Sequence, residues 1–369
     1  MHILHALTHS VHGGGQAVPY QLVRHLQRRR PDVRNTVMLP EGGVYVDTFR
    51  ETGASVVTFP LNTLAFRSAV TIRGTVSRIA PDIIHTHGRG AGLYLRTLPA
   101  GVTAARRVHS HHGFHLPEHW PHSTVFRIAE ERFLQRTDAV IAVSESEREV
   151  ILRTNPGSQP KVTVIRNIVD AGEVRRRALV PDSGAADILH EMERYPTVIM
   201  VGRDDPVKNH PLAFRAAATV LRESTEPRFV FVGITPAVPG FRSLSDDFPG
   251  RVHAAGLVAN PLPFIAQSAL LLMTSKREGS PLAVMEAAAL GVPAVAVRTR
   301  GLDEAVRDGE TGLLTGDKAE EVAAAVLRCL SDSRRLKRLS EGARAAADAW
   351  DLDAWMEKYL AVYAGATAC

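Results

Sequence analysis

The stretch covering residues 269–293 limits most strongly the folds that are open to this chain. An apolar run at residues 269–273 is typical of a strand buried inside a parallel sheet. Ser280 then offers a side-chain oxygen as an N-cap, so a helix is predicted over residues 281–290. Gly291 ends that helix, because glycine tolerates the left-handed conformation in which many helices stop. The stretch therefore predicts a strand–loop–helix unit of an α/β protein.

The predicted start of this helix suits an anion. The amides of Ser280, Leu282 and Ala283 would lack helical partners there, and a helix N-terminus favours a phosphate or diphosphate. Glu278 precedes the helix and could accept hydrogen bonds from a sugar on the distal phosphate. Glu286 would lie roughly 7–8 Å from the helix start, which is about the distance from a diphosphate to a ribose. A carboxylate at that place suits two ribose hydroxyls.

Carboxylates beside a diphosphate require cations that balance their charge. Lys276 and Arg277 are adjacent in the sequence. Arg203 and Lys208 follow a second predicted buried strand, at residues 197–202. Side chains that follow a strand of an α/β sheet face the ligand crevice, so Arg203 and Lys208 are predicted to hold the diphosphate.

Short apolar strands alternate with helical segments throughout, which predicts parallel α/β sheets. With 369 residues the chain is too long for one compact core and suits two domains, with a linker and a helix at residues 171–194. No apolar run approaches the roughly 20 residues of a membrane helix, and the first residues do not resemble a signal peptide. Cys329 and Cys369 form no metal or redox motif, which fits a reducing cytosol.

Charge is distributed unevenly along the chain. Residues 1–168 contain 20 lysines and arginines against 12 acidic residues, whereas residues 169–369 contain 24 against 27. The first half also holds 13 of the 16 histidines. A basic half favours an anionic surface or substrate. Nucleic acid is not expected as a partner, because no aromatic-studded basic patch or DNA-reading motif is present.

A predicted helix at residues 68–79 belongs to this basic half. Arg67, Arg73 and Arg78 accompany it, and its apolar positions form only a partial stripe. Such a helix is either an ordinary surface helix or a face that rests on anionic lipid.

Histidines gather at the ends of two predicted strands. His85 and His87 end one strand, and residues 108–115 contain a second cluster. Metal ligation by such a group has to be considered, but the spacings match no zinc motif and no cysteine is near. Hydrogen bonding to a sugar is the better interpretation, so no metal is expected.

Gly13, Gly14 and Gly15 stand between a predicted strand at residues 3–7 and a helix predicted to begin near Val18. Glycines at a strand-to-helix turn let the backbone approach a ligand, although a triplet alone could form a tight turn. The pattern differs from the Gly-x-Gly-x-x-Gly fingerprint, so no nicotinamide or flavin cofactor is expected.

Together these motifs resemble the retaining glycosyltransferases of family 4, which have the GT-B fold. The spacing of Glu278 and Glu286, followed by Ala-x4-Gly-x-Pro, is similar to the family signature. Arg203 and Lys208 match the family cations that hold the donor diphosphate. The segment from His112 resembles the one whose histidine approaches the donor sugar, with His115 as the alternative, and the glycine triplet resembles a loop that faces donor phosphates and acceptor.

The resemblance spans nearly the whole chain and implies an architecture. It implies an α/β protein of two Rossmann-like, doubly wound parallel-sheet domains that face a central cleft. The acceptor domain would comprise residues 1–170 and the donor domain residues 171–350, with the C-terminal helix in residues 351–369 crossing back to the first domain. The implied catalytic residues are His112, Arg203, Lys208 and Glu278, and the implied substrate-binding residues are Gly14, Gly15, Gly279, Ser280, Pro281, Leu282 and Glu286.

The implied activity is transfer of a sugar from a nucleoside diphosphate sugar, with retention, to a hydroxyl of a glycan, lipid-linked or small-molecule acceptor. A polysaccharide or glycoconjugate pathway in the cytoplasm is expected, with peripheral contact to the inner face of an anionic membrane left open. No cofactor and no metal are expected. The alternatives are a nucleotide-sugar epimerase of the same fold and an inactive protein that binds sugar nucleotides.

Overall fold

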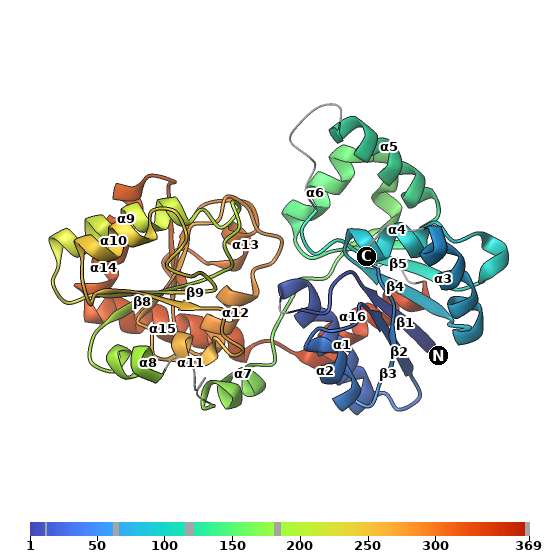
Figure 1. The fold of residues 1–369 in the computed structure, drawn as a ribbon, viewed down its shortest axis with the longest axis horizontal. Helices are drawn as coiled ribbons and strands as arrows, with labels where there is room; N and C mark the ends of the chain where they lie inside the picture. The colour runs from blue at the N-terminus through green and yellow to red at the C-terminus, as the bar shows by residue number, and fades with distance from the viewer. Residues whose placement is uncertain (12, 62–65, 115–121, 181–185, 366–369) are drawn as a thin grey trace. The chain divides into compact units, whose positions relative to one another are not determined.

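The computed structural model divides into two compact units, each built around one parallel sheet (Figure 1). Unit 1 comprises Met1–Asn167 together with Asp351–Cys369, and unit 2 comprises Ile168–Trp350. The structure describes residues 1–11, 13–61, 66–114, 122–180 and 186–365.

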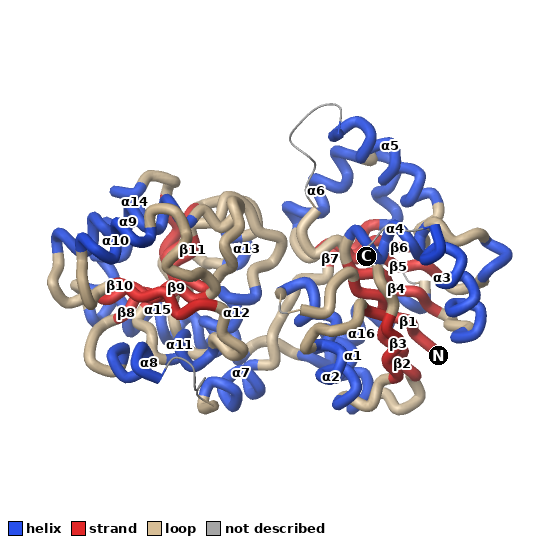
Figure 2. The backbone as a smooth tube through the Cα atoms, in the orientation of Figure 1, coloured by secondary structure: helices blue, strands red, loops and turns tan. Residues whose placement is uncertain are grey.

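Unit 1 is built on a seven-stranded sheet in the order β3-β2-β1-β4-β5-β6-β7, in which every pairing is parallel. Figure 2 shows the strands of this sheet in red, with helices of the unit around them. The chain winds outward in both directions from β1 and β4, and the carboxyl ends of strands at such a switch point are where ligands bind in open α/β sheets. The strands are β1 (His2–Leu7), β2 (Arg34–Leu39), β3 (Ser55–Thr58), β4 (Ile83–His87), β5 (Arg106–Ser110), β6 (Ala139–Ala142) and β7 (Val162–Val164).

Helices cover both faces of this sheet, which explains why its central strands β1 and β4 are buried at every position. One core joins the sheet to α1 and α2, and another joins it to α3 and α4. The helices are α1 (Gly14–Arg29), α2 (Tyr45–Glu51), α3 (Phe66–Ile79), α4 (Arg89–Arg96), α5 (His122–Gln135), α6 (Glu145–Thr154) and α16 (Leu352–Ala364).

Helix α16 returns from unit 2 to unit 1, as predicted. The indole Nε1 of Trp355 donates to the carbonyl oxygen of Arg166 at 3.0 Å. The hydroxyl of Tyr363 lies 2.7 Å from Nδ1 of His85, which is in the centre of the sheet. The C-terminal helix is therefore an integral part of the first unit.

Unit 2 is built on a six-stranded parallel sheet in the order β10-β9-β8-β11-β12-β13. The strands are β8 (Thr197–Val201), β9 (Arg228–Val232), β10 (Val252–Gly256), β11 (Leu270–Met273), β12 (Ala294–Val297) and β13 (Gly312–Thr315). The helices are α7 (Ala171–Ala178), α8 (Ala186–Met192), α9 (His210–Glu223), α10 (Phe241–Asp247), α11 (Leu262–Ala266), α12 (Leu282–Ala289), α13 (Leu302–Ala305), α14 (Ala319–Leu330) and α15 (Ser333–Asp348).

Strand β11 shows why the sheet needs uninterrupted apolar sequence. Leu270 and Leu272 lie in the core that includes α9 and α14, whereas Leu271 and Met273 lie in the core that includes α11 and α12. Successive side chains of a strand point to opposite faces, so a strand covered on both faces must be apolar at every position.

The segment at residues 171–194, predicted as a linker and a helix, contains the two helices α7 and α8. Asp170 caps α7, because its side chain accepts a hydrogen bond from the amide of Glu173. From the same helix, Nε of Arg175 donates to the carbonyl oxygen of Ala289 at 2.8 Å. Helix α7 is thereby fastened to the end of α12.

A buried ion pair joins α4 to α5 in unit 1. Nη2 of Arg96 lies 2.6 Å from Oε1 of Glu130, and the two side chains are 2% and 5% exposed. The Nε of Arg96 also donates to the hydroxyl of Thr137 at 3.0 Å. A buried pair of this kind stabilises only while both charges are present.

We predict that Glu130→Ala lowers the free energy of unfolding of unit 1 by about 3–5 kcal/mol, because it leaves the guanidinium of Arg96 buried and unpaired. Urea denaturation would measure the loss. The control is Glu149→Ala, which breaks the exposed pair with Arg153 and should cost at most about 0.5 kcal/mol. Equal effects of the two substitutions would contradict the prediction.

Candidate functional site

In unit 2 the loops that follow β8 and β11 lie against each other. The amide of Lys276 donates to the carbonyl oxygen of Val207 at 2.8 Å, and the hydroxyl of Thr274 donates to the carbonyl oxygen of Lys208 at 3.0 Å. Strands β8 and β11 are neighbours in the sheet, so their carboxyl ends open at the same edge. The two stretches in which the sequence predicts phosphate-binding groups are therefore adjacent.

A half-buried ion pair connects these loops. Nζ of Lys208 lies 2.8 Å from Oε1 of Glu278, with 26% and 15% of the two side chains exposed. Gly202 allows the lysine stem to lie close, since an added Cβ would come within 3.2 Å of that stem. Arg203, in contrast, is exposed, and no ion pair of its side chain occurs within the described residues. One predicted cation is paired and the other is turned to solvent.

The loop that carries Glu278 is supported by its neighbour. The amide of Glu278 donates to the carbonyl oxygen of Arg300 at 2.8 Å. Gly301 has a φ of +83°, and a Cβ there would lie 2.3 Å from the carbonyl oxygen of Glu278. Only glycine fits at this position, because any side chain would displace the backbone of Glu278 and Gly279.

Helix α12 begins one residue later than predicted, and the predicted N-cap is wrong. The first helical residue is Leu282, and the N-cap is Pro281, which is extended at φ −74° and ψ 109° and makes no side-chain cap bond. The φ of Pro281 would fit a helix, but its extended ψ places the residue outside the helix, so the cap lies one position later than Ser280. Gly291 has φ +74° after the helix, as the sequence indicates. The amides of Leu282 and Ala283 remain in the first turn, where no intrahelical acceptor exists.

Glu286 lies within α12 and is half-buried. Burial raises the pKa of its carboxyl to about 7, and the guanidinium of Arg177 on α7 opposes that shift. The group therefore changes its charge near neutral pH, unlike an ordinary glutamate.

In unit 1 the predicted sugar-binding histidine follows β5 in a tight turn. His112 has φ +54° and Gly113 has φ +113°. A left-handed histidine is an uncommon conformation that surrounding contacts have to maintain. His115, the alternative, lies outside the described residues.

Glu147, which was not among the predicted site residues, maintains this turn. One carboxylate oxygen accepts the amides of Gly113 and Phe114, both at 2.6 Å, and the other accepts the amide of Val143 at 2.7 Å. Burial raises the pKa of Glu147, and the three amides oppose that shift. The side chain of Ser144 caps α6 by accepting a hydrogen bond from the amide of Glu147. The Ser-x-x-Glu pattern of a capping box was therefore the one sequence signal for this glutamate. Here the glutamate also reaches the turn after β5.

The glycine triplet has a different structure from the predicted one. Helix α1 begins at Gly14, four residues before the predicted start, so Gly14 and Gly15 form its first turn. Gly13 is the N-cap, and a Cβ at Gly15 would meet no atom within 4 Å. The glycines leave the start of α1 without side chains, which keeps the backbone amides accessible there.

Two family models match the chain. Residues 12–173 match Glycosyltransferase Family 4, and residues 195–332 match Glycosyl transferases group 1. The chain belongs to glycosyltransferase family 4.

Named relatives in this family are similar over part or most of their length. The D-inositol 3-phosphate glycosyltransferase of Acidothermus cellulolyticus is 34% identical over 54% of this chain, and the match spans 45% of that protein. The protein of the same name from Thermomonospora curvata is 28% identical over 77% of this chain and 72% of its own length. The alpha-D-kanosaminyltransferase of Streptomyces kanamyceticus is 25% identical over 70% of this chain and 71% of its own length.

Solved structures show the fold. Anabaena HepE in complex with UDP and glucose has a TM-score of 0.83 at 18% identity, with 99% of each chain covered. The sucrose-phosphate synthase of Thermosynechococcus elongatus has a TM-score of 0.77 at 17% identity, covering 99% of this chain and 98% of that one. Together with the two parallel sheets, these likenesses show that this family 4 protein has the predicted GT-B fold.

The raised pKa of Glu286 leads to a pH prediction for a family 4 donor site. If Glu286 holds ribose hydroxyls, its carboxylate binds them better than its protonated form. Affinity for a nucleoside diphosphate sugar should then fall as the pH drops below about 7, approaching about tenfold per pH unit. Calorimetry at a series of pH values measures this, and Glu286→Gln is the control that should remove the dependence. A dependence that survives in Glu286→Gln would assign the titration to another group.

Proposed function

We propose that this chain transfers a sugar from a nucleoside diphosphate sugar to a hydroxyl acceptor, with retention of the anomeric configuration. The observation that carries the proposal is the pair of Lys208 and Glu278 at the edge of the sheet where α12 begins. The relatives support it, since their names describe glycosyl transfer, and HepE was solved with UDP-glucose.

In the proposed reaction Lys208 exchanges partners. The bond from the anomeric carbon to the diphosphate breaks, and negative charge develops on the leaving oxygen. Lys208, Arg203 and the amides of Leu282 and Ala283 stabilise that charge in the role that a metal ion plays in other transferases, so the proposal requires no metal. Glu278 loses its ion pair and instead accepts hydrogen bonds from hydroxyls of the donor sugar.

The remaining donor contacts come from the same loop and helix. Gly279, Ser280 and Pro281 lead into α12 and place its first amides at the diphosphate. Glu286 follows one turn later and accepts the ribose hydroxyls. Glu278 precedes α12 and Glu286 lies inside it. In the proposal the two carboxylates therefore bind different parts of one donor, Glu278 the sugar and Glu286 the ribose.

In unit 1 the proposed contacts are His112 with the donor sugar, and Gly14 and Gly15 with phosphates or acceptor. No side chain is assigned as a nucleophile, and a donor phosphate oxygen takes the acceptor proton. The acceptor is a glycan, a lipid-linked sugar or a small molecule. An anionic acceptor fits the basic charge of residues 1–168, and the relatives named for D-inositol 3-phosphate provide a specific candidate.

We predict that Lys208→Ala and Arg203→Ala each lower kcat by about 10²–10³, if each cation acts like a lost oxyanion donor. Calorimetry with uridine, guanosine and adenosine diphosphate sugars first selects the donor, and transfer is then measured with D-inositol 3-phosphate and with glycan acceptors. Lys318→Ala is the matched control, since Lys318 is exposed on the same unit.

Activity of Lys208→Ala close to that of the unchanged protein would contradict the assignment. Release of an altered nucleotide sugar without any acceptor would instead identify an epimerase. Binding without turnover of any tested donor and acceptor would favour an inactive sugar-nucleotide protein.

We also propose a peripheral contact of α3 with an anionic membrane at the cytoplasmic face. None of the described helices combines the length and apolar composition needed to cross a membrane. Arg73 and Arg78 are exposed on α3, and Val70 is 56% exposed beside them. Such a surface combines basic charge with an apolar side chain, which favours anionic lipid.

Replacing Arg67, Arg73 and Arg78 by glutamine should abolish binding to vesicles that contain phosphatidylglycerol, as measured by cosedimentation. The control replaces Arg334, Lys337 and Arg338 on α15, which removes the same charge from unit 2 and should leave binding unchanged. Equal binding of the α3 variant and the unchanged protein would reject this helix as the contact.

A further inference from the structure

Three histidines in unit 1 form a hydrogen-bonded chain that ends at His112. Nε2 of His112 lies 2.9 Å from Nδ1 of His87, and Nε2 of His87 lies 3.4 Å from Nδ1 of His5. Nε2 of His5 in turn lies 3.3 Å from Oδ1 of Asn35. The chain thus runs from β2 through β1 and β4 to the turn after β5.

The rings of this chain meet end to end. The ring centroids of His87 and His112 are 5.2 Å apart with an interplanar angle of 18°, and those of His5 and His87 are 5.7 Å apart at 19°. In both pairs the distance between ring centroids equals the distance between the bonded nitrogens plus about one ring radius on each side. The two centroids and the two nitrogens must therefore lie nearly on one line. The nitrogens therefore point straight at each other, as in a linear hydrogen bond.

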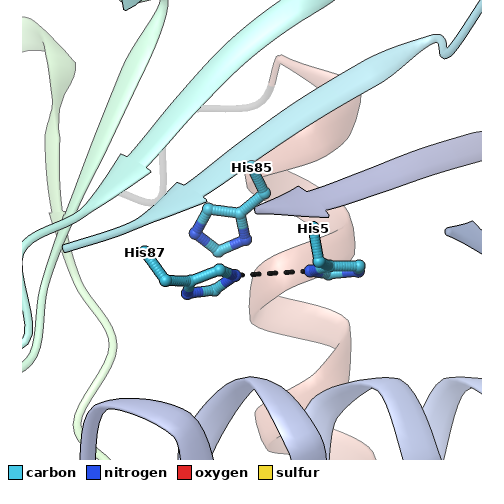
Figure 3. Close-up of side chains that lie close together, drawn as sticks. All are labelled: His5, His85 and His87. Atoms are coloured by element: carbon cyan, nitrogen blue, oxygen red, sulfur yellow. Dashed lines mark hydrogen bonds between the residues drawn. The ribbon is translucent and has the colours of Figure 1, made fainter. Parts of the chain in front are cut away.

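The same geometry argues against a metal. Ligand atoms of His5, His85 and His87 lie within 4.8 Å of one another, the one such group among the described residues (Figure 3). A metal bound by both nitrogens would have to lie off the line that joins them, because half of 3.4 Å is shorter than the roughly 2.0–2.1 Å of a zinc–nitrogen bond, whereas the two nitrogens point along that line. Both ring nitrogens of His85 already bond hydroxyls, those of Ser110 and Tyr363.

Asn35 gives the chain its direction. The Nδ2 of Asn35 donates to Oε1 of Gln27 at 2.9 Å and to the carbonyl oxygen of Val33 at 3.5 Å. A carbonyl only accepts, so this contact fixes the amide orientation and turns Oδ1 toward His5. The proton of His5 must then be on Nε2.

The remaining tautomers follow in order. With its proton on Nε2, neutral His5 accepts at Nδ1, so His87 donates from Nε2 and accepts at Nδ1. His112 then donates from Nε2 to His87. Burial lowers the pKa of His5 and of His112 to about 4, and that of His87 well below its ordinary value, so the rings are neutral at physiological pH.

The chain therefore leaves a lone pair on Nδ1 of His112. This atom is buried and has no hydrogen-bond partner among the described residues. A buried acceptor without a partner is costly, and a ligand that donates a hydrogen bond to it would remove that cost. The backbone of His112 is held by Glu147 through Gly113, so the atom is presented in a fixed direction.

We infer that Asn35, His5 and His87 are positioning residues, which set the tautomer of His112 so that its Nδ1 accepts a hydrogen bond from a sugar hydroxyl. This inference rests on the proposed function for the identity of the ligand, but not for the tautomer. The site requires a ligand with an O–H donor at that place. Two donor analogues should lose this hydrogen bond: a sugar that lacks the contacting hydroxyl, and a sugar in which fluorine, which cannot donate, replaces it.

The test is long-range hydrogen–nitrogen correlation NMR of the ligand-free protein with ¹⁵N-labelled histidine, which separates the two neutral tautomers. The signals of His112 are assigned from their loss in His112→Gln. We expect the Nε2–H tautomer in the unchanged protein, and a mixed or Nδ1–H tautomer in Asn35→Leu. Asn35→Asp keeps an acceptor for His5 and should restore the Nε2–H tautomer.

Tyr363→Phe is the matched control. It removes a hydrogen bond to His85, a histidine of the same cluster outside the chain, and should leave the tautomer of His112 unchanged. In transfer assays Asn35→Leu should lower kcat/KM about tenfold, the effect of one mispaired hydrogen bond, with recovery in Asn35→Asp.

An Nδ1–H tautomer of His112 in the unchanged protein, or an Nε2–H tautomer that persists in Asn35→Leu, would overturn the inference. Stoichiometric metal bound to the purified protein, with histidine signals that shift on chelation, would also overturn it. Because the NMR measurement needs no substrate, a protein with the expected tautomers but no transfer activity would refute the proposed function and not the histidine chain.

Discussion

The parallel pairing of β8 with β11 is the constraint on which the candidate site of unit 2 depends. Val198 pairs with Leu270 and Ile199 with Leu271, so the two strands end at one edge of the sheet. The loops that follow are then joined by main-chain hydrogen bonds, and Lys208 meets Glu278. Strand register, which is set by apolar packing in the cores, thereby determines where the charges of the site lie.

In unit 1 strand register also determines where the groups of the site lie, but here the groups are polar side chains inside the sheet. Strands β1, β4 and β5 carry histidines that are buried rather than exposed, among them His5, His87 and His109. Such groups are tolerated because nearly every polar atom has a partner, and Glu147 supplies three of these bonds for backbone amides. A network of this kind fixes side-chain directions more strictly than apolar packing does.

The sequence was sufficient for the fold and for the placement of its motifs. Apolar runs such as residues 269–273 are predictable because a strand covered on both faces tolerates nothing else. Helix starts were less predictable. Ser280 has the chemistry of an N-cap, but Pro281 is extended and is itself the cap residue, and α1 begins at Gly14 although glycine disfavours helices. In both places local backbone geometry outweighed residue preference.

Contacts between distant residues were beyond the sequence patterns. Ser144 and Glu147 indicated only a helix cap, and nothing local showed that the glutamate reaches Gly113. The bond between His5 and His87 joins residues 82 positions apart, so it follows from strand order and not from spacing. The roles of all the predicted site residues, including Arg203, Lys208 and His112, stay predictions, since they depend on a ligand.

The ion pair of Lys208 and Glu278 also bears on how a turnover would end. In the proposed reaction the intact donor satisfies both charges at once, the cation through its diphosphate and the carboxylate through its sugar. After transfer the carboxylate has lost its hydroxyl partners and competes with the diphosphate for the same lysine. In the proposed reaction the carboxylate can re-form its pair with the lysine as the nucleotide leaves, so the emptied site is not left with two uncompensated charges.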